Sequence, residues 1–179
     1  RPHIPPSERD TMNSILKKAA LAAALATASL SATAAESHIK VYTNVDTTLA
    51  LMKADGSALP DLITLAHIPG QGLNAHTERV RIYTNDESKD IEVRLTAEPS
   101  LVLRSGGGTP IPLAVSLNKK RLTVAAQDFL ASEIYDGGLP GASVVMDLQI
   151  GQATRAPITV AGEYEGIVSV AMVQKTGAP

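Results

Sequence analysis

The alternation of apolar and polar residues is the feature that most limits the folds open to this chain. A period of two places successive side chains on opposite faces of a β-strand, whereas an amphipathic helix needs a period of 3.6. Six such runs within one small domain predict an all-β protein, an immunoglobulin-like antiparallel β-sandwich. The runs are Ile39/Val41/Thr43/Val45, Val80/Ile82/Thr84, Ile91/Val93/Leu95, Leu113/Val115/Leu117, Met146/Leu148/Ile150 and Val168/Val170/Met172.

Turn-forming sequences separate these runs. They include Asp55-Gly56, Asn85-Asp86, Gly106-Gly107-Gly108, Asn118-Lys119-Lys120 and Asp136-Gly137-Gly138. Glycine, asparagine and aspartate accept the backbone conformations that tight turns need. The segment from Thr123 to Ala131 is the one place where the spacing of apolar residues predicts a helical turn, with Thr123 as its N-cap.

The start of the sequence predicts export. Met12 opens a short region with Lys17 and Lys18, an alanine-rich apolar run follows, and Ala32-Thr33-Ala34 has the small-x-small pattern that signal peptidase cleaves. We expect residues 12–34 to be a signal peptide cut between Ala34 and Ala35, with a cut one residue later nearly as favourable. Residues 1–11 precede a complete signal and are interpreted as an upstream extension outside the native protein. The chain is therefore expected to be exported through the periplasm.

The amino-acid composition excludes several classes of function. Residues 1–34 carry four basic and two acidic side chains, so the formal net charge changes from −2 for the whole chain to −4 for residues 35–179. A mildly acidic chain without a basic cluster predicts no nucleic-acid partner. The sequence has no cysteine, which excludes disulfides and cysteine-ligated metals. Stability must then come from packing and backbone pairing.

The sequence has only weak matches to motifs for cofactor binding, metal binding or catalysis. Residues 70–75, GQGLNA, have the spacing of a dinucleotide-binding turn, but Pro69 precedes them and an alternating strand follows where a helix should begin, so a hairpin loop is the better interpretation. His38, His67 and His76 lack the close ligand spacing of a zinc site. No Gly-x-Ser-x-Gly sequence is present. We predict no cofactor, no metal, no catalytic residue and no enzyme activity.

The two ends of the predicted domain carry the remaining information. Residues 35–46 form a strand in which Ile39, Val41, Thr43 and Val45 share one face, and such a strand can fill an apolar groove from one side. Taken alone, the pattern favours a simpler interpretation, in which residues 35–46 are the first strand of the chain's own domain. Near the other end, Val168, Val170 and Met172 share one face of an apolar last strand, which would be prone to aggregate if its edge were unpaired.

Sequence segments spread over residues 36–173 resemble the major pilins of the class 5, or alpha-type, chaperone–usher fimbriae, which include the colonization factor antigen fimbriae and the cable pili. These segments are ESHIKVYTNVD, LALMKADGSALP, YTNDESKDIEVRL, PIPLAVSLNKKRL, QDF and GEYEGIVSVAMV. They occur in the family order with similar spacing.

This resemblance implies a function and partners. In the family the mature N-terminal segment is a donor strand that completes the sandwich of the neighbouring subunit, which gives residues 35–46 that role and residues 47–179 the role of an incomplete pilin domain. Ile39, Val41, Thr43 and Val45 would be the inward donor residues. Val168, Val170 and Met172 would line the acceptor groove and pair beforehand with a periplasmic chaperone.

The implied protein is the major structural subunit of an adhesive cell-surface fimbrium. It would form a homopolymer, pass an outer-membrane usher, carry a tip adhesin and support attachment to host surfaces. Two alternatives stay open at this point. A self-complete secreted β-sandwich that binds a ligand would pair residues 35–46 within its own domain and stay monomeric. A secreted enzyme would show a deep cleft with converging carboxylates.

Overall fold

The computed structural model describes residues 37–43 and 49–176, with backbone only for the first of these ranges. Contacts divide the chain into two units, residues 1–34 and 35–179, and all described residues belong to the second. The strands are β1 (Ser37–Thr43), β2 (Leu49–Lys53), β3 (Ile63–Leu65), β4 (His67–Ile68), β5 (Gly72–Leu73), β6 (His76–Thr84), β7 (Ile91–Leu95), β8 (Ser100–Leu103), β9 (Ile111–Leu117), β10 (Lys120–Leu122), β11 (Gln127–Phe129), β12 (Met146–Gln152) and β13 (Tyr164–Gln174). The helix α2 spans Ala131–Ile134.

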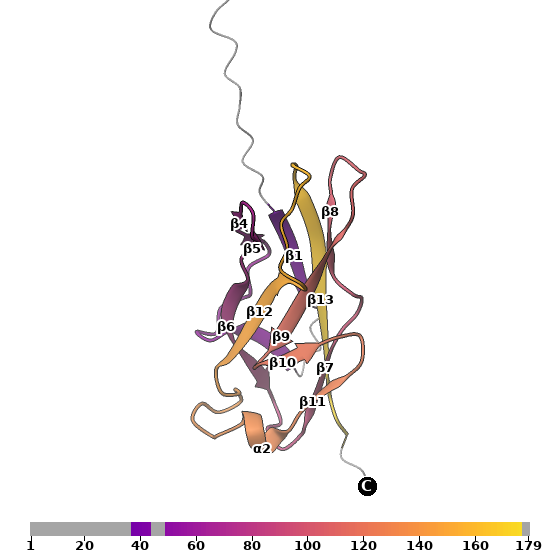
Figure 1. Cartoon of the computed structure of the whole chain (residues 1–179). Helices are drawn as coiled ribbons and strands as arrows, with labels where there is room; N and C mark the ends of the chain where they lie inside the picture. Colours follow the sequence, from indigo (N-terminus) through magenta and orange to yellow (C-terminus); the bar gives the residue numbers. More distant parts are fainter. Residues whose placement is uncertain (1–36, 44–48, 177–179) are drawn as a thin grey trace, which may run out of the picture. The chain divides into compact units, whose positions relative to one another are not determined.

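The strands form two layers (Figure 1). One layer has the order β11-β7-β13-β1-β3, and the other has the order β10-β9-β12-β6-β2. Strand β8 pairs with both β13 and β9 and so connects the layers at one side. The all-β sandwich predicted from the alternation is thus present. Every pairing among the described strands is antiparallel except that of β1 with β13, which is parallel.

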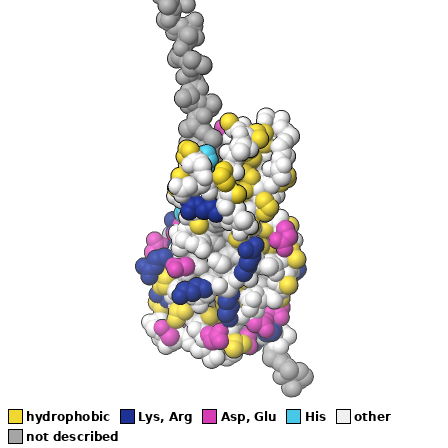
Figure 2. Space-filling view, in the orientation of Figure 1, with side chains coloured by type: hydrophobic (Ala, Val, Ile, Leu, Met, Phe, Trp, Pro, Cys, Tyr) yellow, Lys and Arg dark blue, Asp and Glu magenta, His cyan; other side chains and the backbone are white. Residues whose placement is uncertain are grey.

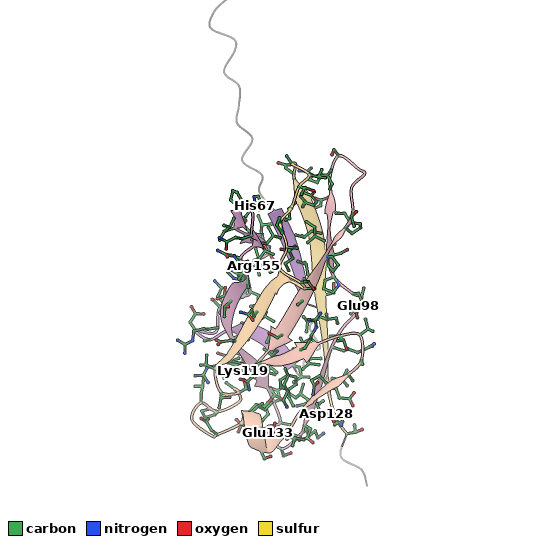
Figure 3. The ribbon with its side chains drawn as sticks, in the orientation of Figure 1. His67, Glu98, Lys119, Asp128, Glu133 and Arg155 are labelled. Carbon is green, nitrogen blue, oxygen red and sulfur yellow. The ribbon has the colours of Figure 1, made fainter. Side chains whose placement is uncertain are left out.

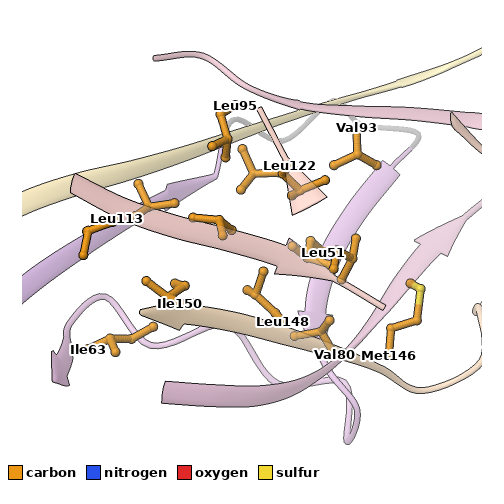
Figure 4. Packing of buried hydrophobic residues seen from close by; sticks show 14 of the residues in the cluster. Leu51, Ile63, Val80, Val93, Leu95, Leu113, Leu122, Met146, Leu148 and Ile150 are labelled. Atoms are coloured by element: carbon orange, nitrogen blue, oxygen red, sulfur yellow. The ribbon is translucent and has the colours of Figure 1, made fainter. Parts of the chain in front are cut away.

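The core lies between the layers and consists of the inward residues of the alternating strands (Figure 4). On β9, for example, Leu113, Val115 and Leu117 are buried while Pro112 is exposed. In the close-up, Leu95 and Val93 of one layer face Leu113, Leu148 and Ile150 of the other. Burying an aliphatic side chain of this size stabilises a fold by roughly 1.5–3 kcal/mol, so this core is the main stabilising element of a chain without disulfides.

The predicted turns are found, and the turn between β9 and β10 shows why its residues favour that conformation. Asn118 and Lys119 have φ angles of 48° and 67° and connect β9 to β10 in a two-residue hairpin. Positive φ at both central positions defines a type I′ turn, and asparagine tolerates this conformation better than most residues. The glycine-rich segment 70–75 likewise belongs to the β4–β5 hairpin, as the sequence favoured.

The predicted helical turn at 123–131 is wrong. Gln127–Phe129 form strand β11, which pairs with β7, and the helix begins only at Ala131. The reason is tertiary: Phe129 is fully buried opposite Ile91, and this burial outweighs the local helical spacing. Thr123 caps a turn instead, since its Oγ1 accepts the N–H of Ala125 at 3.2 Å. No helix in the described ranges is long and apolar enough to cross a membrane.

We predict that Ser143→Ala destabilises the sandwich. Ser143 is fully buried, and its Oγ accepts the Ile82 N–H at 2.9 Å while donating to the Val144 carbonyl at 2.8 Å. Alanine would leave a buried N–H without a partner, which costs about 1–3 kcal/mol. Urea unfolding should show this loss, whereas Ser132→Ala at an exposed position should stay within about 0.5 kcal/mol of wild type. Equal stability of the two variants would contradict the assignment.

Candidate functional site: the groove that holds β1

The first wall of the groove is strand β13. Its residues alternate: Tyr164, Val168, Val170 and Met172 are buried, while the odd-numbered residues face outward, as Ile167 does with 59% of its surface exposed. The pattern follows from the period of two, because only one face of this strand touches the core. Strand β13 therefore contributes its buried face to the core and one of its edges to the groove.

The second wall is strand β3, which the sequence analysis did not identify. Ile63 and Leu65 are buried and Thr64 between them is exposed, so β3 also turns one apolar face to the core. Among the described strands, β3 forms its ladder with β1 alone. Without β1, both β3 and one edge of β13 would have unpaired backbone N–H and C=O groups.

Strand β1 lies between these walls, as Figure 1 shows for the indigo strand beside the yellow β13. It pairs with β13 in parallel from Ser37 opposite Tyr164 to Thr43 opposite Val170. On its other edge it pairs antiparallel with β3, from Ser37 opposite Leu65 to Ile39 opposite Ile63. The groove in this structure is thus filled by the chain's own N-terminal strand, whereas the resemblance predicted a strand from a neighbouring subunit.

The register relates the predicted donor residues to the groove. Ile39, Val41 and Thr43 are the partners of Gly166, Val168 and Val170, respectively. Each of these β13 positions belongs to the inward series of that strand. Met172 lies beyond the paired stretch and is opposite Val93 of β7 instead. Val45 and the predicted cleavage residues Ala34 and Ala35 lie outside the described residues.

Gly166 permits a close approach of backbones in the middle of this arrangement. A Cβ at this position would lie 2.2 Å from the carbonyl oxygen of Ser100, at the point where β8 leaves β13 to pair with β9. Such a distance is well inside van der Waals contact, so only glycine fits without movement of the backbone. Gly166 therefore allows β13 to pair with β1 on one edge while β8 crosses beside it.

Beyond the Tyr164 end of the groove is an open pocket of about 130 Å³. It is lined by His67, Leu73, residues 158–162 and Tyr164, whose hydroxyl donates to the Val160 carbonyl at 2.9 Å. No two carboxylates meet there, and the described residues contain no group of three His, Cys, Asp or Glu side chains that could hold a metal ion. The labelled side chains in Figure 3, from His67 to Glu133, are spread over different elements instead of converging.

Charge is also dispersed. On the face in Figure 2, basic and acidic side chains are interspersed over the lower part and sparse near the upper end. Several form surface pairs, such as Arg104 with Glu163 at 2.8 Å and Lys175 with Asp128 at 2.8 Å. The Asp128 carboxylate beside Lys175 raises the pKa of that amine. This face presents no basic patch.

Comparison with known proteins identifies the family. The sequence model of the CS1 type fimbrial major subunit matches residues 35–173. The chain belongs to this family. It is similar to a CS1 fimbrial protein of Escherichia coli, with 34% identity over 169 residues covering 90% of this chain and 99% of the relative. A CFA/I fimbrial protein of Escherichia coli O78:H11 (strain H10407 / ETEC) is 33% identical over 148 residues, covering 80% and 87%, respectively.

A solved structure agrees with the sequence relatives. The CooA pilin from enterotoxigenic Escherichia coli superposes with a TM-score of 0.63 at 28% identity, covering 74% of this chain and 90% of the pilin. The family resemblance and the immunoglobulin-like sandwich predicted from the sequence are thereby confirmed. This fimbrial major subunit is a structural protein of the pilus shaft, located in a cell-surface fimbria.

We predict that Gly166→Ala destabilises this fimbrial protein by about 1–3 kcal/mol, the usual range for overpacking, because its Cβ would collide with the Ser100 carbonyl. Ser169→Ala, three residues along the same strand and half-buried, should change the stability by less than about 1 kcal/mol. Urea denaturation of both variants measures the difference. If Gly166→Ala unfolded at the wild-type urea concentration, the close approach would not constrain the strand.

Proposed function

We propose that this fimbrial major subunit polymerises by donor-strand complementation, in which residues 35–46 of one copy fill the groove between β3 and β13 of the next. The observation that carries the proposal is that the strand between these two walls, β1, precedes all other described strands, so cleavage after Ala34 would make it terminal. A terminal strand can leave its place without breaking the connection between any other two strands. The same groove can then accept the identical strand from a second copy, giving a homopolymer.

The energetics support a strand in this groove. Both edges of β1 form ladders, with seven residue pairs to β13 and three to β3. Each main-chain hydrogen bond contributes about 0.5–1.5 kcal/mol net, and each aliphatic side chain buried from the donor adds roughly 1.5–3 kcal/mol. A slip of one residue would exchange Val41 for Lys40 or Tyr42 at the same position, so the pairing is expected to be specific in register.

The predicted signal sequence and the edge of β13 that borders the groove also suggest how the subunit would reach the cell surface. We propose that residues 12–34 are a signal peptide removed between Ala34 and Ala35, which leads the chain to the periplasm; the family match begins at residue 35, which supports this boundary. An unfilled groove would expose the apolar face and free edge of β13, so a periplasmic chaperone would cover Val168, Val170 and Met172 before an outer-membrane usher assembles the shaft. A tip adhesin would complete the fimbria. Neither catalysis nor a cofactor is needed.

A second candidate function is a self-complete secreted β-sandwich that binds a ligand. Two observations favour it: β1 pairs within its own domain, and the pocket beside His67 and Tyr164 is open. It differs from the first proposal in requiring that the chain stay monomeric and that β1 never leave. The family membership weighs toward the shaft subunit.

Val41→Asp should abolish fibres. The charge would enter the inward series of the donor strand, where an unpaired carboxylate is costly, and Val45→Asp should act in the same way. Chaperone binding should persist, because β13 is unchanged. Electron microscopy and extraction of surface fibres measure polymer, and co-purification measures the chaperone complex.

Lys40→Asp is the matched control, since the period of two places residue 40 on the opposite face of the strand from residue 41. It should assemble close to normally. Normal fibres from Val41→Asp cells would argue against the role of residues 35–46 as a donor strand. If Lys40→Asp also abolished fibres, the loss would come from the added negative charge and not from the inward position of residue 41.

A chain beginning at Thr47 should be stabilised by a separate peptide of residues 35–46. At a peptide concentration of 100 times Kd the gain in unfolding free energy is about 2.7 kcal/mol, seen as a higher melting temperature. The same peptide with Val41→Asp should give little or no shift. A truncated chain that is stable by itself and indifferent to the peptide would favour the self-complete binding module.

A further inference from the structure

The direction of β1 is fixed by the length of chain that follows it. Residues 44–48 alone connect Thr43 to Leu49, the first residue of β2. Leu49 is opposite Thr84, and the Thr84 hydroxyl bonds to the side chain of Gln174, the last residue of β13. The start of β2 therefore lies near the Gln174 end of β13, in the other layer.

Only the parallel direction satisfies this connection. Thr43 is opposite Val170, four residues from Gln174, a distance of about 13 Å along the strand. If β1 ran the other way in its own groove, Thr43 would be opposite Tyr164, about 33 Å from Gln174. Six Cα–Cα steps from Thr43 to Leu49 reach at most about 22 Å. A chain filling its own groove must run parallel to β13, whereas a strand from a second copy has no such constraint.

The short connection also makes the chain's own strand the favoured occupant at low concentration. A strand tethered to its own groove by only a few residues has an effective concentration in the millimolar range. At micromolar protein concentrations, the chain's own strand is then favoured over an equally well-fitting strand from a second copy by on the order of 1,000-fold. Polymer forms only if this occupant is displaced.

We propose that the unassembled subunit is self-complemented: β1 occupies its own groove parallel to β13 and must withdraw before the groove accepts a strand from a second copy. This inference rests on the proposed function, since it concerns the same groove. It assigns β1 two roles, an autoinhibitory strand before assembly and a donor in the fibre. In the self-complemented subunit, β1 pairs with the edges of β3 and of β13 residues 164–170 that border the groove. These two edges are then closed to a strand from another copy, which protects the subunit from premature polymerisation.

A disulfide between β1 and β13 tests this state, and the absence of native cysteine makes the test clean. In the exported chain from Ala35, Tyr42→Cys and Ser169→Cys introduce thiols at partner positions of the parallel register. Neighbouring strands are about 4.8 Å apart, inside the range of Cα separations that a disulfide spans. On oxidation with glutathione disulfide, the purified monomer should form an intramolecular bond, seen as an oxidised monomer on a non-reducing gel and by intact mass.

The matched control pairs Tyr42→Cys with Glu165→Cys. Residue 165 has an outward position on the same strand but lies four residues from the partner of Tyr42, about 13 Å away in the parallel register and too far for a disulfide. It would face residue 42 if β1 were reversed about the Lys40–Ile167 pair. Bond formation in the control equal to that in the first pair would overturn the proposal, as would a first pair that gives only intermolecular bonds or free thiols.

Measurements of polymerisation distinguish the self-complementation proposal from the proposed donor-strand function. The oxidised Tyr42→Cys/Ser169→Cys monomer should lose the ability to polymerise in light scattering at high concentration, and reduction should restore it. Polymerisation while oxidised would overturn autoinhibition. If wild type polymerises but its Ser37–Thr43 amides exchange as fast as an unstructured peptide in the monomer, self-complementation fails while the donor-strand function stands. If Val41→Asp polymerises normally, the donor-strand function itself fails.

Discussion

The need to pair the backbone edge of β13 shapes the rest of this structure. The strand buries one face in the core through Val168 and Val170, and residues of the same stretch pair with β1 along an edge. An apolar strand with an unpaired edge of this length can form backbone hydrogen bonds with other chains and so promotes aggregation. In this structure the chain's own β1 covers the edge.

The core and the groove are consequently one energetic unit. Gly166 allows β8 to pass close to β13, and β8 in turn joins the two layers through its pairing with β9. The chain has no disulfide to hold a partly filled groove together, so occupancy of the groove affects the stability of the whole sandwich. This coupling suits the proposed donor-strand assembly, in which the strand that links two copies would also stabilise the subunit that receives it.

Long alternating runs were readable from the sequence, and short elements were not. Strands β6, β7, β9, β12 and β13 coincide with predicted runs because each buries one face against the core and so repeats with a period of two. Strand β3, the second wall of the groove, has three residues and too few positions for a period to show. The helical turn predicted at 123–131 failed because burial of Phe129 against β7 decides that segment.

The sequence by itself determined the fold class, the family resemblance and the residues of β1 and β13 that share one face. These properties depend on local periodicity and on motifs that lie along the chain. Only the tertiary structure decided that β3 forms the second wall, that β8 crosses beside Gly166 and that β1 runs parallel to β13 in its own groove. Those features depend on which distant strands become neighbours and on how far residues 44–48 can reach, and neither is encoded in the alternation of a single segment.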